Sequence, residues 1–93
     1  MKTIWTVWAD YGATGEGHTL MVWIGYAVDA AEAQYSFVEK FGELFAKFCR
    51  AEQGAVINEV TAVLLPAETA KRLERARGRA NLEFYSSLHI NAS

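Results

Sequence analysis

Two β-rich runs near the N-terminus carry large apolar side chains on both of their faces. Successive side chains of a strand point to opposite faces, so a strand with one solvated face alternates apolar and polar residues. Residues 3–11 and 18–28 do not alternate in this way, and a glycine-rich segment, 12–17, separates them. We therefore expect an antiparallel hairpin whose two faces both need to be covered. The first run places Trp5, Val7, Ala9 and Tyr11 opposite Ile4, Thr6 and Trp8, and the second places Leu20, Val22, Ile24 and Tyr26 opposite Met21, Trp23 and Ala27.

A helix is predicted to begin at Asp29. The carboxylate of Asp29 can cap the free backbone N–H groups of the first turn, and Glu32 stands three residues later, as in a capping box. Gly54 is expected to end the helix, because glycine readily adopts the left-handed conformation found just after many helices. Apolar residues recur along this stretch at the spacing of one helical face. They are Phe37, Val38, Phe41, Leu44, Phe45 and Phe48.

The second half of the chain predicts a strand, a helix and a last strand. Residues 55–65 are rich in valine, isoleucine and leucine and are short enough for a third strand, which Pro66 would end. Proline is tolerated at a helix start, and residues 67–77 contain good helix formers. Residues 82–91 alternate apolar and polar side chains almost strictly, which indicates a fourth strand with one buried face.

The order β-β-α-β-α-β predicts an α+β fold in one domain, residues 1–93. Two helices would cover one face of a mixed four-stranded sheet, giving a two-layer sandwich. The apolar groups on the other face of the hairpin would then need cover from elsewhere, and we expect a second copy of the chain to supply it in a closed two-fold dimer. We expect Trp5, Trp8 and Trp23 in that interface, because tryptophan is enriched in such contacts.

Composition limits the class of protein. Apolar residues make up 52% of the chain, which argues against disorder. The sequence shows neither a signal peptide nor a stretch of about 20 apolar residues, so we expect a cytoplasmic protein without a membrane partner. Cys49 is the only cysteine, which excludes an internal disulfide and a cysteine-based zinc site within one chain. No cofactor and no metal site is predicted.

Residues 12–18 and the two histidines are the candidates for chemistry. The glycine-rich segment lacks the Lys-Ser/Thr pair and the following helix of a phosphate loop, so we interpret it as a hairpin loop. His18 and His89 are far apart in the sequence, and His89 shares the polar side of the last strand with Tyr85. Such a row could line a small pocket or form an ordinary solvated sheet face. The pocket hypothesis assigns His18, Tyr26, Tyr85 and His89 as ligand contacts.

Basic residues gather in the predicted second helix and just after it. Residues 66–93 carry a net charge of +2, whereas residues 1–65 carry −4. Nucleic acid is one possible partner, but the total charge of −2 disfavours it, and an acidic protein partner or simple helix-dipole stabilisation explains the cluster as well. The residues of this basic patch are Lys71, Arg72, Arg75, Arg77 and Arg79.

Two functional hypotheses follow. The first is a non-enzymatic binding or regulatory module that self-associates and binds a protein partner through aromatic and basic surfaces. The alternative is a small-molecule-binding or enzymatic dimer with an aromatic pocket between helix and sheet. No motif identifies a nucleophile or a catalytic acid and base, so the sequence favours the module.

Overall fold

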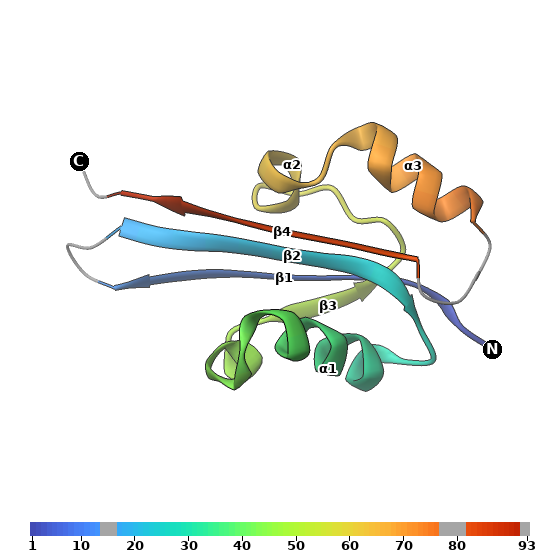
Figure 1. The fold of residues 1–93 in the computed structure, drawn as a ribbon, viewed down its shortest axis with the longest axis horizontal. Helices are drawn as coiled ribbons and strands as arrows, with labels where there is room; N and C mark the ends of the chain where they lie inside the picture. Colours follow the sequence, from blue (N-terminus) through green and yellow to red (C-terminus); the bar gives the residue numbers. More distant parts are fainter. Residues whose placement is uncertain (14–16, 77–81, 92–93) are drawn as a thin grey trace.

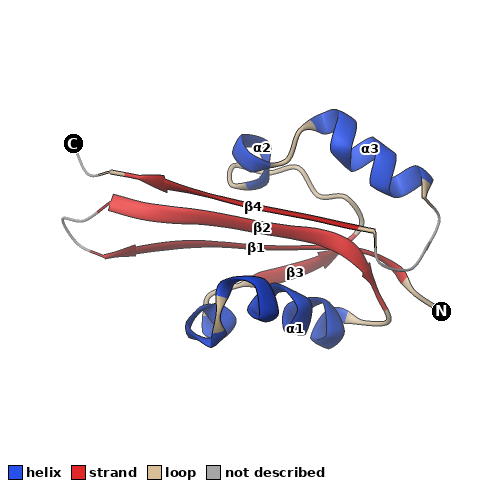
Figure 2. Cartoon of the chain, viewed as in Figure 1, coloured by secondary structure: helices blue, strands red, loops and turns tan. Residues whose placement is uncertain are grey.

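A computed structural model describes residues 1–13, 17–76 and 82–91 (Figure 1). The chain forms an α+β fold with a four-stranded sheet (Figure 2). Its elements are β1 (Thr3–Ala13), β2 (Gly17–Ala27), α1 (Ala30–Phe41), the 3-10 helix η1 (Glu43–Lys47), β3 (Arg50–Gln53), α2 (Thr61–Leu64), α3 (Ala67–Arg75) and β4 (Glu83–Ile90). The two N-terminal strands, the start of the first helix, the proline-initiated helix and the last strand confirm the corresponding predictions.

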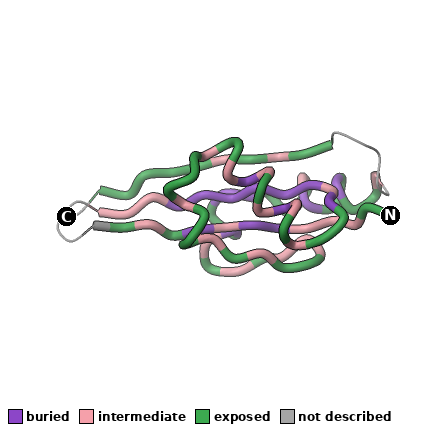
Figure 3. The backbone as a smooth tube through the Cα atoms, turned by 90° about the horizontal axis from the view of Figure 1, so that it is seen from below, coloured by how far each residue is buried: buried purple, intermediate pink, exposed green. Residues whose placement is uncertain are grey.

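The sheet is antiparallel throughout and has the order β3-β1-β2-β4. The prediction of a mixed sheet is therefore wrong. The hairpin of β1 and β2 lies in the centre, where Val7 stands opposite Trp23, and the short β3 and the longer β4 form the two edges. Figure 3 shows burial concentrated in the central strands, whereas β4 is exposed along most of its length.

Helices lie on both faces of this sheet, which corrects the prediction of two helices on one face. On one face α1 packs its buried Ala33 and Phe37 against Val7, Met21 and Trp23. On the other face α3 packs Ala70 and Leu73 against Ile24, and α2 packs Leu64 against Leu20 and Val22. The sheet is thus the middle of three layers (Figure 1). The expectation that both hairpin faces are covered holds, but the chain's own α2 and α3 provide the second cover.

The first helix is shorter than predicted. It ends at Phe41, because Gly42 adopts a φ of 108° and donates its N–H to the carbonyl of Val38. Positive φ strains any residue with a side chain, so glycine marks the end of the helix here as the sequence argument supposed for Gly54. After Gly42 the chain forms η1, whose Phe45 and the following Phe48 pack edge-on against Tyr11.

The third strand lies at residues 50–53 and not at 55–65, as the apolar run had predicted. Two buried threonines hold the 54–58 segment in another conformation. Val56 donates its N–H to the hydroxyl of Thr6 at 3.0 Å, and its carbonyl accepts from the hydroxyl of Thr61 at 2.7 Å. The backbone groups of Val56 that a strand would use are therefore already satisfied by side chains. Asn58 then turns the chain into α2 by accepting from the N–H groups of Val60 and Thr61.

Candidate functional site

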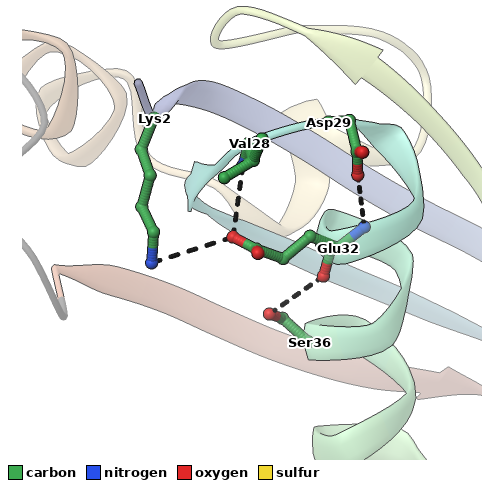
Figure 4. A network of polar contacts seen from close by, with 5 residues as sticks. All are labelled: Lys2, Val28, Asp29, Glu32 and Ser36. Carbon is green, nitrogen blue, oxygen red and sulfur yellow. Dashed lines mark hydrogen bonds and ion pairs between the residues drawn. The ribbon is translucent and has the colours of Figure 1, made fainter.

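The start of α1 is fixed by a closed set of polar contacts (Figure 4). The carboxylate of Asp29 accepts from the N–H of Glu32 at 2.9 Å, and the carboxylate of Glu32 accepts from the N–H of Val28 at 3.1 Å. This confirms the predicted cap. Lys2 adds an ion pair to Glu32 at 3.7 Å, and the hydroxyl of Ser36 donates to the Glu32 carbonyl. The contacts orient the first turn of the helix, so its carboxylates have a structural role.

A second polar link joins β4 to α1. The indole N–H of Trp23 donates to Glu83 at 2.7 Å, and the ammonium of Lys40 lies 3.1 Å from the other carboxylate oxygen. Lys40 also stands 4.9 Å from the ring centre of Tyr85, and that ring packs edge-on against Phe41. The hydrogen bond and the charge of Glu83 raise the pKa of Lys40 above its ordinary value of 10.5. These residues tie the edge strand to the helix.

Gly25 makes room for the Trp23 ring in this link. A Cβ added at Gly25 would stand 2.7 Å from a ring carbon of Trp23 and 3.2 Å from the Cβ of Glu83. The close packing leaves Trp23 only 2% exposed. The glycine therefore matters for its lack of a side chain and not for its backbone conformation.

The raised pKa of Lys40 gives a testable pH dependence. A folded-state pKa above the unfolded value means that the stabilisation is fully present below 10.5 and is lost as the pH rises through the folded pKa. The urea midpoint of the wild type should therefore exceed that of Lys40→Met at neutral pH, and the gap should close above pH 10.5. The matched control is Lys47→Met, because Lys47 is exposed in η1 and makes no ion pair with another described residue. A gap that persists unchanged at high pH contradicts this role.

The four residues of the pocket hypothesis do not come together. The hydroxyl of Tyr26 donates to the carbonyl of Leu73 in α3, whereas Tyr85 packs on Phe41, the last residue of α1, on the other face. His18 and His89 also lie on opposite faces, because Thr19, the direct neighbour of His18, is the cross-strand partner of His89. The imidazole of His18 bonds Asp10 at 2.7 Å and that of His89 bonds Thr19 at 2.9 Å.

A polar hollow of about 360 Å³ does lie between α1 and the sheet. Lys2, Glu32, Ser36 and Glu83 contribute to its lining, and of the four predicted contacts only Tyr26 reaches it. Two of its carboxylates, those of Glu32 and Glu83, already contact Lys2, Lys40 and Trp23. Within residues 1–13, 17–76 and 82–91 no cluster of histidine, cysteine or acidic side chains could hold a metal ion.

The three tryptophans predicted for an interface lie in or near the core. Trp23 is buried under α1, and Trp5 packs partly buried against the same cluster. Trp8 is partly buried on the opposite face, beside α2. Other apolar side chains, and not these tryptophans, are exposed on the surface of the described residues. Among the exposed large apolar residues, Leu82, Tyr85, Leu88 and Ile90 fall in or beside β4.

Three residues of the predicted basic patch lie on the exposed side of α3. Lys71, Arg72 and Arg75 are exposed and line a shallow hollow of about 400 Å³ together with Glu68. A neighbouring hollow of about 350 Å³ is lined by Arg72, Leu73, Arg75, Ala76 and Leu82. Arg77 and Arg79, the other two members of the predicted patch, lie outside the described residues. The apolar lining was not anticipated, because Leu82 reaches the helix only through the packing of the chain.

Comparisons with protein-family models, with curated proteins and with solved structures find no match to this chain. In the part of the chain that the structure describes, no helix has the length and apolar character needed to cross a membrane. The functional argument therefore rests on the residues and contacts described above.

Proposed function

We propose that this chain is a non-enzymatic binding module that self-associates and binds an acidic segment of a protein partner through α3. The observation that carries the proposal is the exposed charge of this helix. Lys71, Arg72 and Arg75 form no ion pair with any described residue, although Glu68 and Glu74 stand on the same short helix. Exposed cations on one surface that are not held in ion pairs attract a partner of opposite charge.

The surroundings of the cations favour a peptide over nucleic acid. Leu73, Ala76 and Leu82 give the hollow beside Arg72 and Arg75 an apolar lining, and Leu82 is 42% exposed. No aromatic side chain lines either hollow on α3 within the described residues, so the stacking that single-stranded nucleic acid uses has no platform there. A segment with carboxylates on both sides of a leucine or similar residue matches this combination.

Self-association is supported by the apolar surface that the helices leave open. Tyr85 and Leu88 of β4 are 49% and 45% exposed, although α1, α2 and α3 cover both faces of the central strands. Large exposed apolar patches mark interaction sites, and these two side chains lie on opposite faces of β4, so they flank its free edge on both sides. Native mass spectrometry of the wild type should show a dimer, and a monomer across the whole dilution series contradicts this part of the proposal.

Reversing two charges on α3 should weaken binding of an acidic peptide. In the variant Arg72→Glu/Arg75→Glu, two attractions become repulsions, and we expect the Kd to rise about tenfold to a hundredfold. The probe is a fluorescent peptide of alternating glutamate and leucine, measured by anisotropy. The matched control is Lys47→Glu/Arg50→Glu, which makes the same change of total charge at exposed positions far from α3 in the sequence.

Two outcomes count against the protein-binding proposal. Equal weakening by both double variants would mean that only the total charge matters. The second outcome is a single-stranded oligonucleotide of equal charge that binds more tightly than the peptide and loses affinity steeply with salt. That result would assign the patch to nucleic acid.

A further inference from the structure

The two edges of the sheet are protected to very different degrees. The edge strand β3 has four residues, two of which, Arg50 and Glu52, are charged and exposed. The part of β1 that β3 leaves uncovered carries the charged Asp10 and lies beside η1, where Phe45 and Phe48 pack on Tyr11. Short length and charge are the usual means by which proteins prevent strands from pairing edge to edge.

The edge strand β4 has none of these protections. It has eight residues, spans about 27 Å, and pairs with β2 in an unbroken register without a bulge. Residues 84–90 include neither proline nor a lysine, arginine or carboxylate side chain, and they contain the strand formers Phe84, Tyr85 and Ile90. The one acidic residue of the strand, Glu83, is held by Trp23 and Lys40. Among the described residues, no strand pairs with the outer side of β4.

We propose that the β4 strands of two copies pair antiparallel about a two-fold axis, which joins the two sheets into one of eight strands. The inference rests on the self-association in the proposed function and names the surface that carries it. A second copy fits this edge because two-fold pairing of identical strands is antiparallel, like every other pairing in the sheet. The uncharged residues 84–90 also bring no like charges into opposition.

The register of this pairing is chosen by the match of apolar side chains across the two-fold axis. A two-fold axis perpendicular to the sheet keeps each face continuous across the two copies, so directly opposed residues must belong to the same face. With Ser86 on the axis, Phe84 opposes Leu88 of the second copy, and Leu82 opposes Ile90 of the second copy. Apolar residues then face apolar residues at each of these positions. An axis at Ser87 would instead leave Leu88 opposite a serine.

A cysteine scan tests the edge and the register together. In a Cys49→Ala background, Ser86→Cys should form a disulfide between copies on mild oxidation, because the two new thiols face each other on the axis. The matched control is Ser87→Cys, whose side chain points to the other face and opposes Tyr85 of the second copy. Non-reducing gels should show a covalent dimer for the first variant and a monomer for the second. A cross-link that forms better at Ser87→Cys overturns the register.

A charge on the edge should break the dimer. Leu88→Lys places an ammonium opposite Phe84 at two symmetric positions, and we expect the dimer Kd to rise at least about tenfold. Leu44→Lys is the matched control, since Leu44 is exposed in η1, away from the edge, and should leave the Kd unchanged. Both are measured by native mass spectrometry across a dilution series.

The outcomes separate this inference from the proposed function. A wild-type dimer that Leu88→Lys leaves intact, with no cross-link at Ser86→Cys, overturns the edge pairing while self-association through another surface stands. A wild-type monomer at every concentration overturns both. Loss of the dimer in Leu88→Lys with unchanged peptide binding supports the edge and keeps the role of α3 separate from it.

Discussion

Replacing Phe37 with alanine should lower the free energy of unfolding by about 3–5 kcal/mol. The side chain is fully buried between α1 and the sheet, and its ring lies 4.8 Å from that of Phe41. Its removal takes away the apolar contacts and leaves a cavity that the tightly packed neighbours cannot fill. Because a domain of this size is stable by only about 5–15 kcal/mol, the loss should be plain in urea unfolding.

The control for this prediction is Phe48→Ala. Phe48 belongs to the same apolar helical pattern in the sequence, but the structure places it after η1 with 49% of its surface exposed. We expect a loss of about 1 kcal/mol or less, mainly from its contact with Tyr11. Similar losses for the two variants would mean that the helix continues past Gly42 and buries both rings on one face.

Replacing Thr61 with valine should lower the free energy of unfolding by about 2–4 kcal/mol, the second largest loss expected here after that of Phe37→Ala. Valine has nearly the shape of threonine, so packing is preserved and the hydrogen bonds alone are lost. The Thr61 hydroxyl donates to the carbonyl of Val56 at 2.7 Å and accepts from the N–H of Asn58 at 2.8 Å. Thr61 is fully buried and Val56 and Asn58 are partly buried, so the carbonyl of Val56 and the N–H of Asn58 would face an apolar side chain without a partner.

Thr61→Ser separates the hydroxyl from the methyl group. Serine keeps both hydrogen bonds and loses one buried methyl, which costs about 1 kcal/mol. Urea unfolding should therefore rank the wild type first, then serine, then valine. A valine variant as stable as the serine variant would show that the hydroxyl does not hold the 54–58 segment.

Local signals predicted the elements that depend on neighbouring residues. The alternation in residues 82–91 predicted β4. The pair of Asp29 and Glu32 predicted the start of α1, and Pro66 predicted the start of α3. The third strand was misplaced because its position depends on distant partners. From the sequence alone Val56 resembles a strand residue. Its backbone groups are instead hydrogen-bonded by the hydroxyls of Thr61 and of Thr6, which is 50 positions away. The short and polar β3 has no apolar pattern to reveal it.

The sequence could predict which residues of a candidate site lie together only where all of them belong to one helix or strand. Lys71, Arg72 and Arg75 lie on a helix that the sequence predicted, so their place on one element followed from local signals, and the structure shows that all three line one hollow. The link of Trp23, Glu83 and Lys40 joins three elements, and the sequence shows it only when the register of β2 and β4 is known. The apolar side chains on the second face of the hairpin were interpreted as a dimer surface. The sequence does not show that α2 and α3 fold back over this face, because that contact depends on tertiary packing.

The position of β4 in the chain also affects how the protein folds during synthesis. The strands β1 and β2 are neighbours in sequence and can pair early, whereas β4 joins β2 through contacts such as Trp23 to Glu83, which are 60 residues apart. Closing so long a loop slows folding. A ribosome-bound chain that has not yet reached residue 83 leaves one edge of β2 unpaired. The hairpin therefore emerges before its neighbouring strand, and during that interval Trp23 lacks its hydrogen-bond acceptor and the edge of β2 is open to wrong partners.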